Sequence, residues 1–157
     1  MPTKTKSEFE VGELAPEFDA LDDAGTRHRL SAYRGKTVVL YFYPRDNTPG
    51  CTVEACDFRD NFPAFKKKGA VILGVSGDSA KSHQNFRAKH GLNFPLLLDE
   101  DHALGKAYGV WGEKTLYGRK FMGIIRSTFV IGKDGKIVSA YRKVSVAGHI
   151  AAVLETI

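Results

Sequence analysis

Two cysteines close together in the sequence are the side chains best suited to covalent chemistry. Cys51 follows a run of turn-forming residues, Asn47-Thr48-Pro49-Gly50, and Cys56 lies five residues further on. Most lone cysteines are small buried thiols without a reaction. A helix that begins near Cys51 would instead surround its sulfur with unpaired N–H groups and the positive end of the helix dipole, which favour the reactive thiolate. The sequence therefore predicts a nucleophilic thiol at Cys51.

The spacing of the two cysteines also indicates a conformational switch. On a regular helix, residues five apart are rotated by about 140° from each other, with Cα atoms about 8–9 Å apart. A disulfide needs Cα atoms roughly 4.4–6.8 Å apart. Cys51 and Cys56 therefore cannot bond while such a helix is intact. A pair of this kind is either an accident or a switch that unwinds the helix, and we interpret it as a switch.

The segments on either side of the turn would place Cys51 at the edge of a sheet. Residues 37–43 form an apolar run without polar alternation, which is typical of a strand buried on both faces at the centre of a sheet. Pro44 ends this strand. After the turn, apolar side chains recur at steps of four and three residues, as on one face of a helix: Cys51, Ala55, Phe58, Phe62 and Phe65. We expect Cys51 in the first turn of that helix.

The rest of the chain alternates between strand-like runs and helical segments. The predicted strands lie at residues 70–75 and 94–98, with hairpins at 18–30 and at 127–131 and 136–141. The predicted helices include one capped at 76–79 that runs to about residue 90, one at 103–108 and one at 147–156. This order predicts an α/β protein with a mixed central sheet and helices on both faces.

Two segments are expected to be irregular. Pro63 interrupts the helix that contains Cys51, so the sequence predicts a kink or break near residues 61–62. Residues 110–125 contain several glycines and Trp111, and we predict a long, partly irregular loop in which Trp111 packs against its surroundings.

Length and composition predict one soluble globular domain. The chain has 157 residues, of which 43% are hydrophobic, and no apolar run approaches the roughly 18 residues of a membrane-spanning helix. Residues 1–10 are polar, which predicts a flexible tail rather than a secretory signal, ahead of a domain at 11–157. Two cysteines are too few for a secreted disulfide scaffold, so we expect a cytoplasmic protein, with a removed organelle transit peptide left open.

The positive charge of the chain does not indicate a nucleic-acid partner. The formal net charge is +5, but the basic residues are scattered. The one dense run, Lys66-Lys67-Lys68, closes a predicted helix, where cations are favoured. Neither a nucleic-acid-binding motif nor interleaved aromatic residues accompany it. We therefore expect no nucleic-acid and no membrane partner.

The segment YPRDNTPGCTVEAC at residues 43–56 resembles the active-site segment of peroxiredoxins, in the branch called PrxQ or bacterioferritin comigratory protein. The resemblance extends over the whole chain, from residues 12–18 through 94–96 and 126–129 to the last helix. It implies a thioredoxin-like fold with an N-terminal hairpin extension. It also implies a monomeric peroxidase that needs no metal, haem or flavin cofactor.

The same resemblance implies roles for both cysteines. Cys51 would attack hydrogen peroxide or an organic hydroperoxide and become a sulfenic acid. Cys56 would resolve this acid by forming an intramolecular disulfide. Thioredoxin or a similar dithiol reductant, such as a glutaredoxin-like protein, would then restore both thiols.

Four further residues receive catalytic roles from the resemblance. Thr48 would hydrogen-bond the thiolate and the peroxide, although by spacing alone it could simply cap the helix. Pro44 would cover the thiol and exclude water. Arg126 would stabilise the thiolate, the alternative being an edge arginine in solvent. Glu54 would steady Arg126, the alternative being an ordinary first-turn acid.

The loop residues Arg45 and Asp46 are instead expected to be solvated. Three histidines, His83, His90 and His102, are spread over two segments and do not complete a zinc site with the cysteines, because zinc sites usually have cysteines with roughly two to four residues between them and converging ligands. No metal site is predicted.

Two other functions remain as alternatives. A disulfide oxidoreductase of the thioredoxin type would have Cys-x-x-Cys at the helix start, whereas position 54 is Glu. A redox-responsive binding protein or holdase chaperone would use peroxide only as a signal. It would be oxidised once, whereas an enzyme would consume many equivalents of peroxide.

Overall fold

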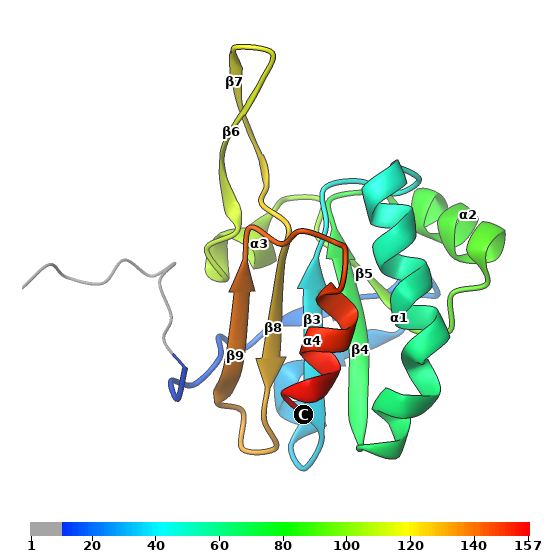
Figure 1. The fold of residues 1–157 in the computed structure, drawn as a ribbon, viewed down its shortest axis with the longest axis vertical. Helices are drawn as coiled ribbons and strands as arrows, with labels where there is room; N and C mark the ends of the chain where they lie inside the picture. The colour runs from blue at the N-terminus through cyan, green and yellow to red at the C-terminus, as the bar shows by residue number, and fades with distance from the viewer. Residues whose placement is uncertain (1–10) are drawn as a thin grey trace, which may run out of the picture.

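A five-stranded mixed sheet organises the described part of the chain, residues 11–157 of this computed structural model (Figure 1). The predicted tail, residues 1–10, lies outside the described residues. The strand order is β5-β4-β3-β8-β9. The strands span Thr37–Phe42 (β3), Ala70–Ser76 (β4), Leu96–Leu98 (β5), Ser127–Ile131 (β8) and Ile137–Arg142 (β9). β3 pairs in parallel with β4 and antiparallel with β8, which makes the sheet mixed as predicted.

β3 is the central strand, and it is buried on both faces as its apolar run predicts. All six of its residues are buried. Val39 and Tyr41 belong to one hydrophobic core, whereas Leu40 and Phe42 belong to the core on the opposite face. This alternation follows from the period of two residues along a strand.

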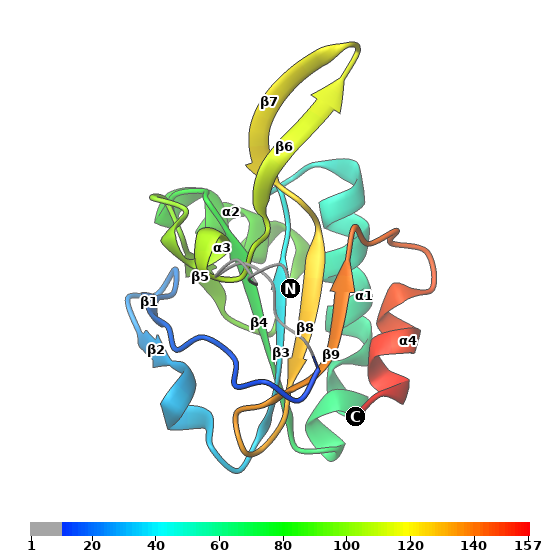
Figure 2. The same cartoon turned by 90° about the vertical axis from the view of Figure 1, so that its left-hand side faces the viewer.

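Helices cover one face of the sheet. The first core is closed by Phe58 of α1, Phe86 of α2 and Ile150 of α4. Figure 2 shows α1 and α4 on one side of the edge-on sheet. The three helices are α1 (Pro49–Lys67), α2 (Ala80–His90) and α4 (His149–Glu155). They confirm the predicted helices near residues 51–65, 80–90 and 147–156.

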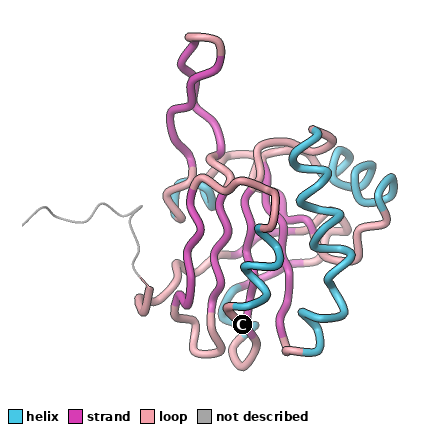
Figure 3. Tube along the Cα trace, viewed as in Figure 1, coloured by secondary structure: helices cyan, strands magenta, loops and turns pink. Residues whose placement is uncertain are grey.

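The other face carries shorter elements. Leu30 and Leu104 belong to the second core, together with Phe18 from the N-terminal segment. The elements are the antiparallel hairpin β1 (Asp19–Leu21) and β2 (Arg27–Arg29), the short 3-10 helix η1 (Leu30–Tyr33) and α3 (Ala103–Ala107). The predicted N-terminal hairpin and the predicted α/β fold with both faces covered are thus confirmed; in Figure 3 the strands lie between helices and loops.

Of the kink or break predicted near Pro63, the break is wrong, because α1 continues through Pro63 to Lys67; the kink stays a prediction. A proline inside a helix frees the carbonyl four residues earlier, here that of Arg59. Asn93 Nδ2 donates to this carbonyl at 3.4 Å. A side chain from outside the helix therefore replaces part of what the proline removes, which the sequence of the helix alone does not reveal.

The predicted loop at 110–125 is also wrong, because most of it forms a β-hairpin. β6 (Trp111–Leu116) and β7 (Arg119–Ile124) pair over their full length. Tyr117 and Gly118 connect them with φ values of 52° and 76°. Two consecutive positive φ values are the mark of a type I′ turn, which suits a tight hairpin. The hairpin projects past the end of the sheet at which α1 begins (Figure 1).

Within residues 11–157, no helix combines the length and the apolar character that crossing a membrane requires.

Candidate active site

The thiol of Cys51 lies where the sequence places it, in the first turn of α1 beside the end of β3. α1 starts at Pro49, and Cys51 is 1% exposed. Proline suits the first helical position because its missing N–H would have no intrahelical partner there. Asn47, with φ of 62°, turns the chain between strand and helix. The thiol is therefore shielded from water and lies near the positive end of the helix dipole.

Arg126 contacts the sulfur from the junction between β7 and β8. Its Nη2 donates to Cys51 Sγ at 3.2 Å, and its Nη1 donates to Glu54 Oε1 at 2.6 Å. The Arg126 side chain is 16% exposed and that of Glu54 is fully buried. The structure thus brings together three of the predicted site residues. The alternative of an edge arginine in solvent is wrong, because this guanidinium has two partners and little exposure.

Glu54 is not the first-turn acid of the alternative reading, because the first turn of α1 contains no acidic residue. Burial raises the pKa of Glu54 to about 7, although the Arg126 guanidinium acts to lower it. Within the described part of the chain, its Oε2 is buried without a hydrogen-bond partner. Glu54 therefore changes its charge near neutral pH. The Arg126 guanidinium connects it to the thiol of Cys51.

Arg126 itself stays charged. Burial acts to lower its pKa, but the charges that Glu54 and Cys51 carry when ionised outweigh this effect and raise the pKa. Gly50 lies against the same guanidinium, since a Cβ built on Gly50 would come within 3.2 Å of Arg126 Nη2. Residues of α1 thus contribute to both the charge and the position of a guanidinium that comes from outside the helix.

Thr48 is the N-cap residue of α1, but its side chain does not cap the helix. Its hydroxyl instead donates to the carbonyl of Arg45 at 3.0 Å. The capping alternative is therefore wrong. A hydroxyl that donates one bond keeps its lone pairs for a donor such as the O–H of a hydroperoxide. The catalytic role that the resemblance gives Thr48 stays a prediction.

Pro44 and Cys56, the two remaining candidates for the site, are both half-buried. β3 ends at Phe42, and Pro44 lies two residues further on, in the loop that leads to α1. Its covering role stays a prediction. Both cysteines are free thiols, and the helix is unbroken between them. The helical separation of about 8–9 Å between their Cα atoms therefore applies to this form of the protein.

Two residues near the site were missed by the sequence reasoning. Asp46 was expected in solvent, but it is buried, and its side chain contacts Tyr43, which directly follows β3, and His83 of α2. Arg45 is exposed as expected. Lys114 of β6 is half-buried, and burial followed by the Arg126 guanidinium lowers its pKa, with the Cys51 sulfur acting in the opposite direction. The sequence predicts an irregular loop for the segment that contains Lys114, so it offers no signal that would place this side chain near the site.

Comparison with known proteins identifies relatives of this chain. The chain matches the protein-family model described as the AhpC/TSA family over residues 11–140. Peroxiredoxin Bcp of Bacillus subtilis is 49% identical over 149 residues, which is 95% of each chain. Peroxiredoxin Bcp of Xanthomonas campestris is 55% identical over 130 residues, covering 83% of this chain and 81% of the relative.

Solved structures agree with these matches. The bacterioferritin comigratory protein of Xanthomonas campestris, studied for its alkyl peroxide reduction activity, superposes with a TM-score of 0.84 at 51% identity, over 88% of each chain. A cysteine-to-serine mutant of PrxQ from Xylella fastidiosa superposes with a TM-score of 0.90 at 43% identity, over 95% of each chain.

Proposed function

Since this chain belongs to the AhpC/TSA family and is a peroxiredoxin of the Bcp/PrxQ branch, we propose that Cys51 is the thiol that peroxide oxidises and that Cys56 resolves the product. The protein is a thiol peroxidase with a thioredoxin fold. The observation that carries the assignment of Cys51 is the 3.2 Å contact between its sulfur and the charged Arg126.

In the first step, the thiolate of Cys51 attacks one oxygen of the peroxide and the O–O bond breaks. The sulfur takes up that oxygen and becomes a sulfenic acid, while the other oxygen leaves as water or an alcohol after it gains a proton. Negative charge moves from the sulfur to the leaving oxygen. Arg126 supports this movement, because its guanidinium already contacts the sulfur and keeps its charge throughout.

In the second step, the thiol of Cys56 condenses with the sulfenic acid, a disulfide forms and water leaves. The first turns of α1 must unwind, because an intact helix holds the two residues too far apart. Ala55 and Phe58 are buried and oppose this opening. The disulfide form therefore exposes part of the core beneath α1.

In the third step, an external dithiol reduces the disulfide by thiol–disulfide exchange and supplies the two electrons that the peroxide consumed. We propose thioredoxin, or a glutaredoxin-like protein, as the reductant, and hydrogen peroxide and alkyl hydroperoxides as substrates. We also propose that the protein is a monomer, because the disulfide closes within one chain. A cytoplasmic location is proposed on the cysteine content of the sequence.

The experiment compares the wild-type protein with Cys56→Ser and Cys51→Ser. One equivalent of peroxide should remove two hydrogens from the wild type as a link between Cys51 and Cys56, seen by mass spectrometry. Cys56→Ser should reduce one peroxide per chain but fail to turn over with thioredoxin and its reductase. Cys51→Ser, the matched control, should reduce none.

A dominant disulfide between chains would contradict the resolving role of Cys56, as would full thioredoxin-driven turnover of Cys56→Ser. A wild type that consumes a single equivalent of peroxide even with reductant present would favour the redox-responsive binding protein instead.

A further inference from the structure

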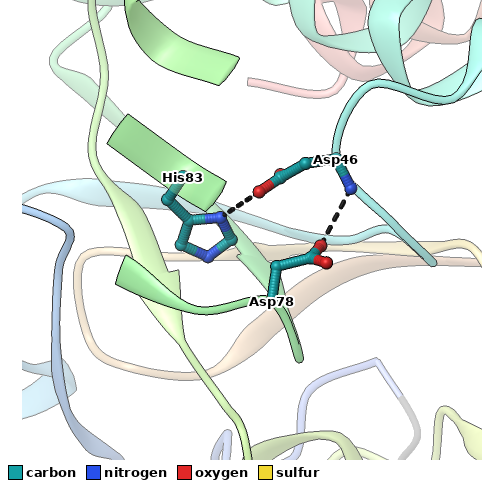
Figure 4. Close-up of side chains that lie close together, drawn as sticks. All are labelled: Asp46, Asp78 and His83. Atoms are coloured by element: carbon teal, nitrogen blue, oxygen red, sulfur yellow. Dashed lines mark hydrogen bonds and ion pairs between the residues drawn. The ribbon is translucent and has the colours of Figure 1, made fainter. Parts of the chain in front are cut away.

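The loop between β3 and α1 is held by a buried carboxylate, that of Asp46. Its Oδ1 accepts from the hydroxyl of Tyr43 at 2.6 Å. Its Oδ2 accepts from Ser82 Oγ at 2.8 Å and faces His83 Nδ1 at 2.7 Å. His83 is fully buried on α2 (Figure 4). A side chain of the loop that leads to Cys51 is therefore anchored to a different helix.

The backbone of the same residue is held as well. The N–H of Asp46 donates to Asp78 Oδ2 at 2.8 Å, and this oxygen also accepts from Ser76 Oγ at 2.6 Å. Figure 4 shows Asp46 between Asp78 on its backbone side and His83 on its carboxylate side. The loop has little freedom at this residue, since both its side chain and its amide have partners.

The contacts of His83 favour a charged ring. Nε2 lies 2.9 Å from the carbonyl of Leu97, which can only accept, so Nε2 carries a hydrogen. Nδ1 faces a carboxylate, so it also carries a hydrogen when Asp46 is ionised. An imidazole with hydrogens on both nitrogens is an imidazolium. His83 and Asp46 therefore form a buried ion pair.

The surroundings of His83 favour that charge. Burial acts to lower the pKa of His83, but the hydrogen bond and charge of Asp46, helped by Leu97 and Asp78, outweigh it and raise the pKa. Within residues 11–157, three titratable groups face the ring: Asp46 from the loop, Asp78 from the turn before α2, and Tyr43 from the end of the loop next to β3, whose hydroxyl lies 3.5 Å from Nδ1. β5 contributes only the carbonyl of Leu97.

The anchored loop includes Thr48, whose predicted role is to hydrogen-bond the peroxide. Asn47 adopts a left-handed conformation with φ of 62°, which is costly unless its neighbours are fixed. The next residue, Thr48, directs its hydroxyl to the carbonyl of Arg45 at 3.0 Å. Asp46 lies between the donor and the acceptor of that bond. Release of Asp46 would therefore change the place of the Thr48 hydroxyl relative to Cys51.

We propose that His83 and Asp46 are positioning residues of the peroxidase, whose ion pair holds the loop 45–48 in the geometry that the reaction of Cys51 with peroxide requires. The proposal rests on the function assigned to Cys51 above. Loss of the His83 proton would leave a lone pair facing either the Asp46 carboxylate or the Leu97 carbonyl. The loop would then loosen, and the peroxide step would slow at high pH.

Asp46, Asp78 and His83 also have the ligand types of a metal site, with potential ligand atoms within 4.8 Å of one another. In this structure those atoms are engaged in hydrogen bonds instead. His83 Nδ1 and Asp46 Oδ2 face each other at 2.7 Å, a hydrogen-bond distance. The carboxylate oxygens already accept hydrogen bonds from hydroxyl groups and a backbone N–H.

The test measures the second-order rate of Cys51 oxidation by hydrogen peroxide in stopped flow, from about pH 6, near the ordinary histidine pKa, up to about pH 9. His83→Gln should lower this rate about tenfold near neutral pH, less than the roughly 100-fold cost of misplacing a reacting group by about 1 Å. The fall of the wild-type rate at high pH should disappear in the variant. His90→Gln, a matched change at the other end of α2, should keep the wild-type rate and profile.

Asp46→Asn and the double variant test whether the two residues act together. Asp46→Asn should also slow oxidation about tenfold, and the double variant should be no slower than the worse single variant, since either change breaks the same pair. Additive losses would contradict the proposal. So would a His83→Gln enzyme with the wild-type rate and pH profile, even if it were less stable.

A measurement on the unaltered protein serves if these variants fail to fold. Nitrogen NMR of the His83 ring should show hydrogens on both nitrogens at neutral pH, and the amide signals of Thr48 and Cys51 should shift with the same midpoint as the ring. A neutral ring at neutral pH would overturn the proposal. So would a ring whose titration leaves the amide signals of Thr48 and Cys51 unchanged. Failure of the assigned function would look different, because wild-type Cys51 would then form no sulfenic acid at any pH.

Discussion

The guanidinium of Arg126 should account for a large part of the reactivity of Cys51, and Arg126→Met tests this. Methionine fills much of the same space without charge or donors. The variant loses the 3.2 Å bond to the sulfur and the 2.6 Å bond to Glu54. We expect slower oxidation of Cys51, because neither the thiolate nor the leaving oxygen then has a cationic partner.

The size of the loss follows from the contact. A hydrogen bond to a charged group contributes about 1.5–3 kcal/mol. Each 1.36 kcal/mol of barrier corresponds to about a tenfold change in rate, so the loss should lie between about 10-fold and 150-fold. The full Coulomb energy of two unit charges at this distance, about 5 kcal/mol at an effective dielectric constant near 20, sets an upper bound.

The assay is the second-order rate of Cys51 oxidation by hydrogen peroxide, measured in stopped flow with one turnover. Arg126→Lys keeps the charge but offers a single point of contact, so its loss should be smaller. The double variant Arg126→Met with Glu54→Gln removes the carboxyl that the first change leaves unpaired. If the double variant recovered the wild-type rate, the loss in the single variant would come from the orphaned Glu54. A rate for Arg126→Met within about twofold of wild type would refute the reasoning outright.

Three further predictions concern the same group. Thr48→Val should lower the peroxide rate by roughly 10²–10³, the scale of one lost hydrogen bond in the transition state, whereas Thr48→Ser should keep most of it; equal losses would indicate a packing role for the methyl group. Gly50→Ala should slow the reaction by about tenfold or less, because its Cβ would press on Arg126 Nη2 at 3.2 Å, and an unchanged rate would show that the guanidinium moves freely. Glu54 has a folded pKa of about 7 against an ordinary value of 4.5, so the folded state binds more protons than the unfolded state between these values. Stability should therefore fall by up to about 3 kcal/mol as pH rises through this range. Urea unfolding at about pH 5 and about pH 8 should show a larger fall in the wild type than in Glu54→Gln, which keeps the fall that the raised pKa of His83 contributes; parallel curves would contradict the raised pKa of Glu54.

The parts of the fold that the sequence predicts are those with a strong local pattern. The apolar run at β3 and the helical recurrence after Cys51 each fix the type of an element, and the turn residues 47–50 fix where one gives way to the other. The thiol therefore lies where local chemistry alone places it. Arg126 is distant in sequence, so local patterns do not predict its contact with Cys51. Only the resemblance to a known family predicts it.

The errors share a physical cause, which is that the deciding partners lie outside the local segment. Pro63 is tolerated because Asn93 donates to the carbonyl of Arg59. Asp46 is buried because His83, far along the chain, supplies the opposite charge.

The missed hairpin β6–β7 has a related cause. Within its two strands Ile124 alone is buried, so the hairpin has no buried face that would require alternating apolar and polar residues. Its two-residue turn, Tyr117-Gly118, has two positive φ values. Asn-Gly is the pair usually expected in such a turn, and Tyr-Gly is therefore a weaker signal in the sequence.

The reduced geometry of Cys51 is supported mainly from outside the helix that carries it. The first turn of α1 has no acidic residue and no side-chain cap, although a cap would stabilise the helix by about 1 kcal/mol. Arg126 holds the sulfur from the junction of β7 and β8, and Asp46 holds the preceding loop through α2. A helix start stabilised by its own caps would resist the unwinding that brings Cys56 to Cys51. With the support placed on neighbouring elements, the same residues can be fixed for the peroxide step and released for the disulfide step.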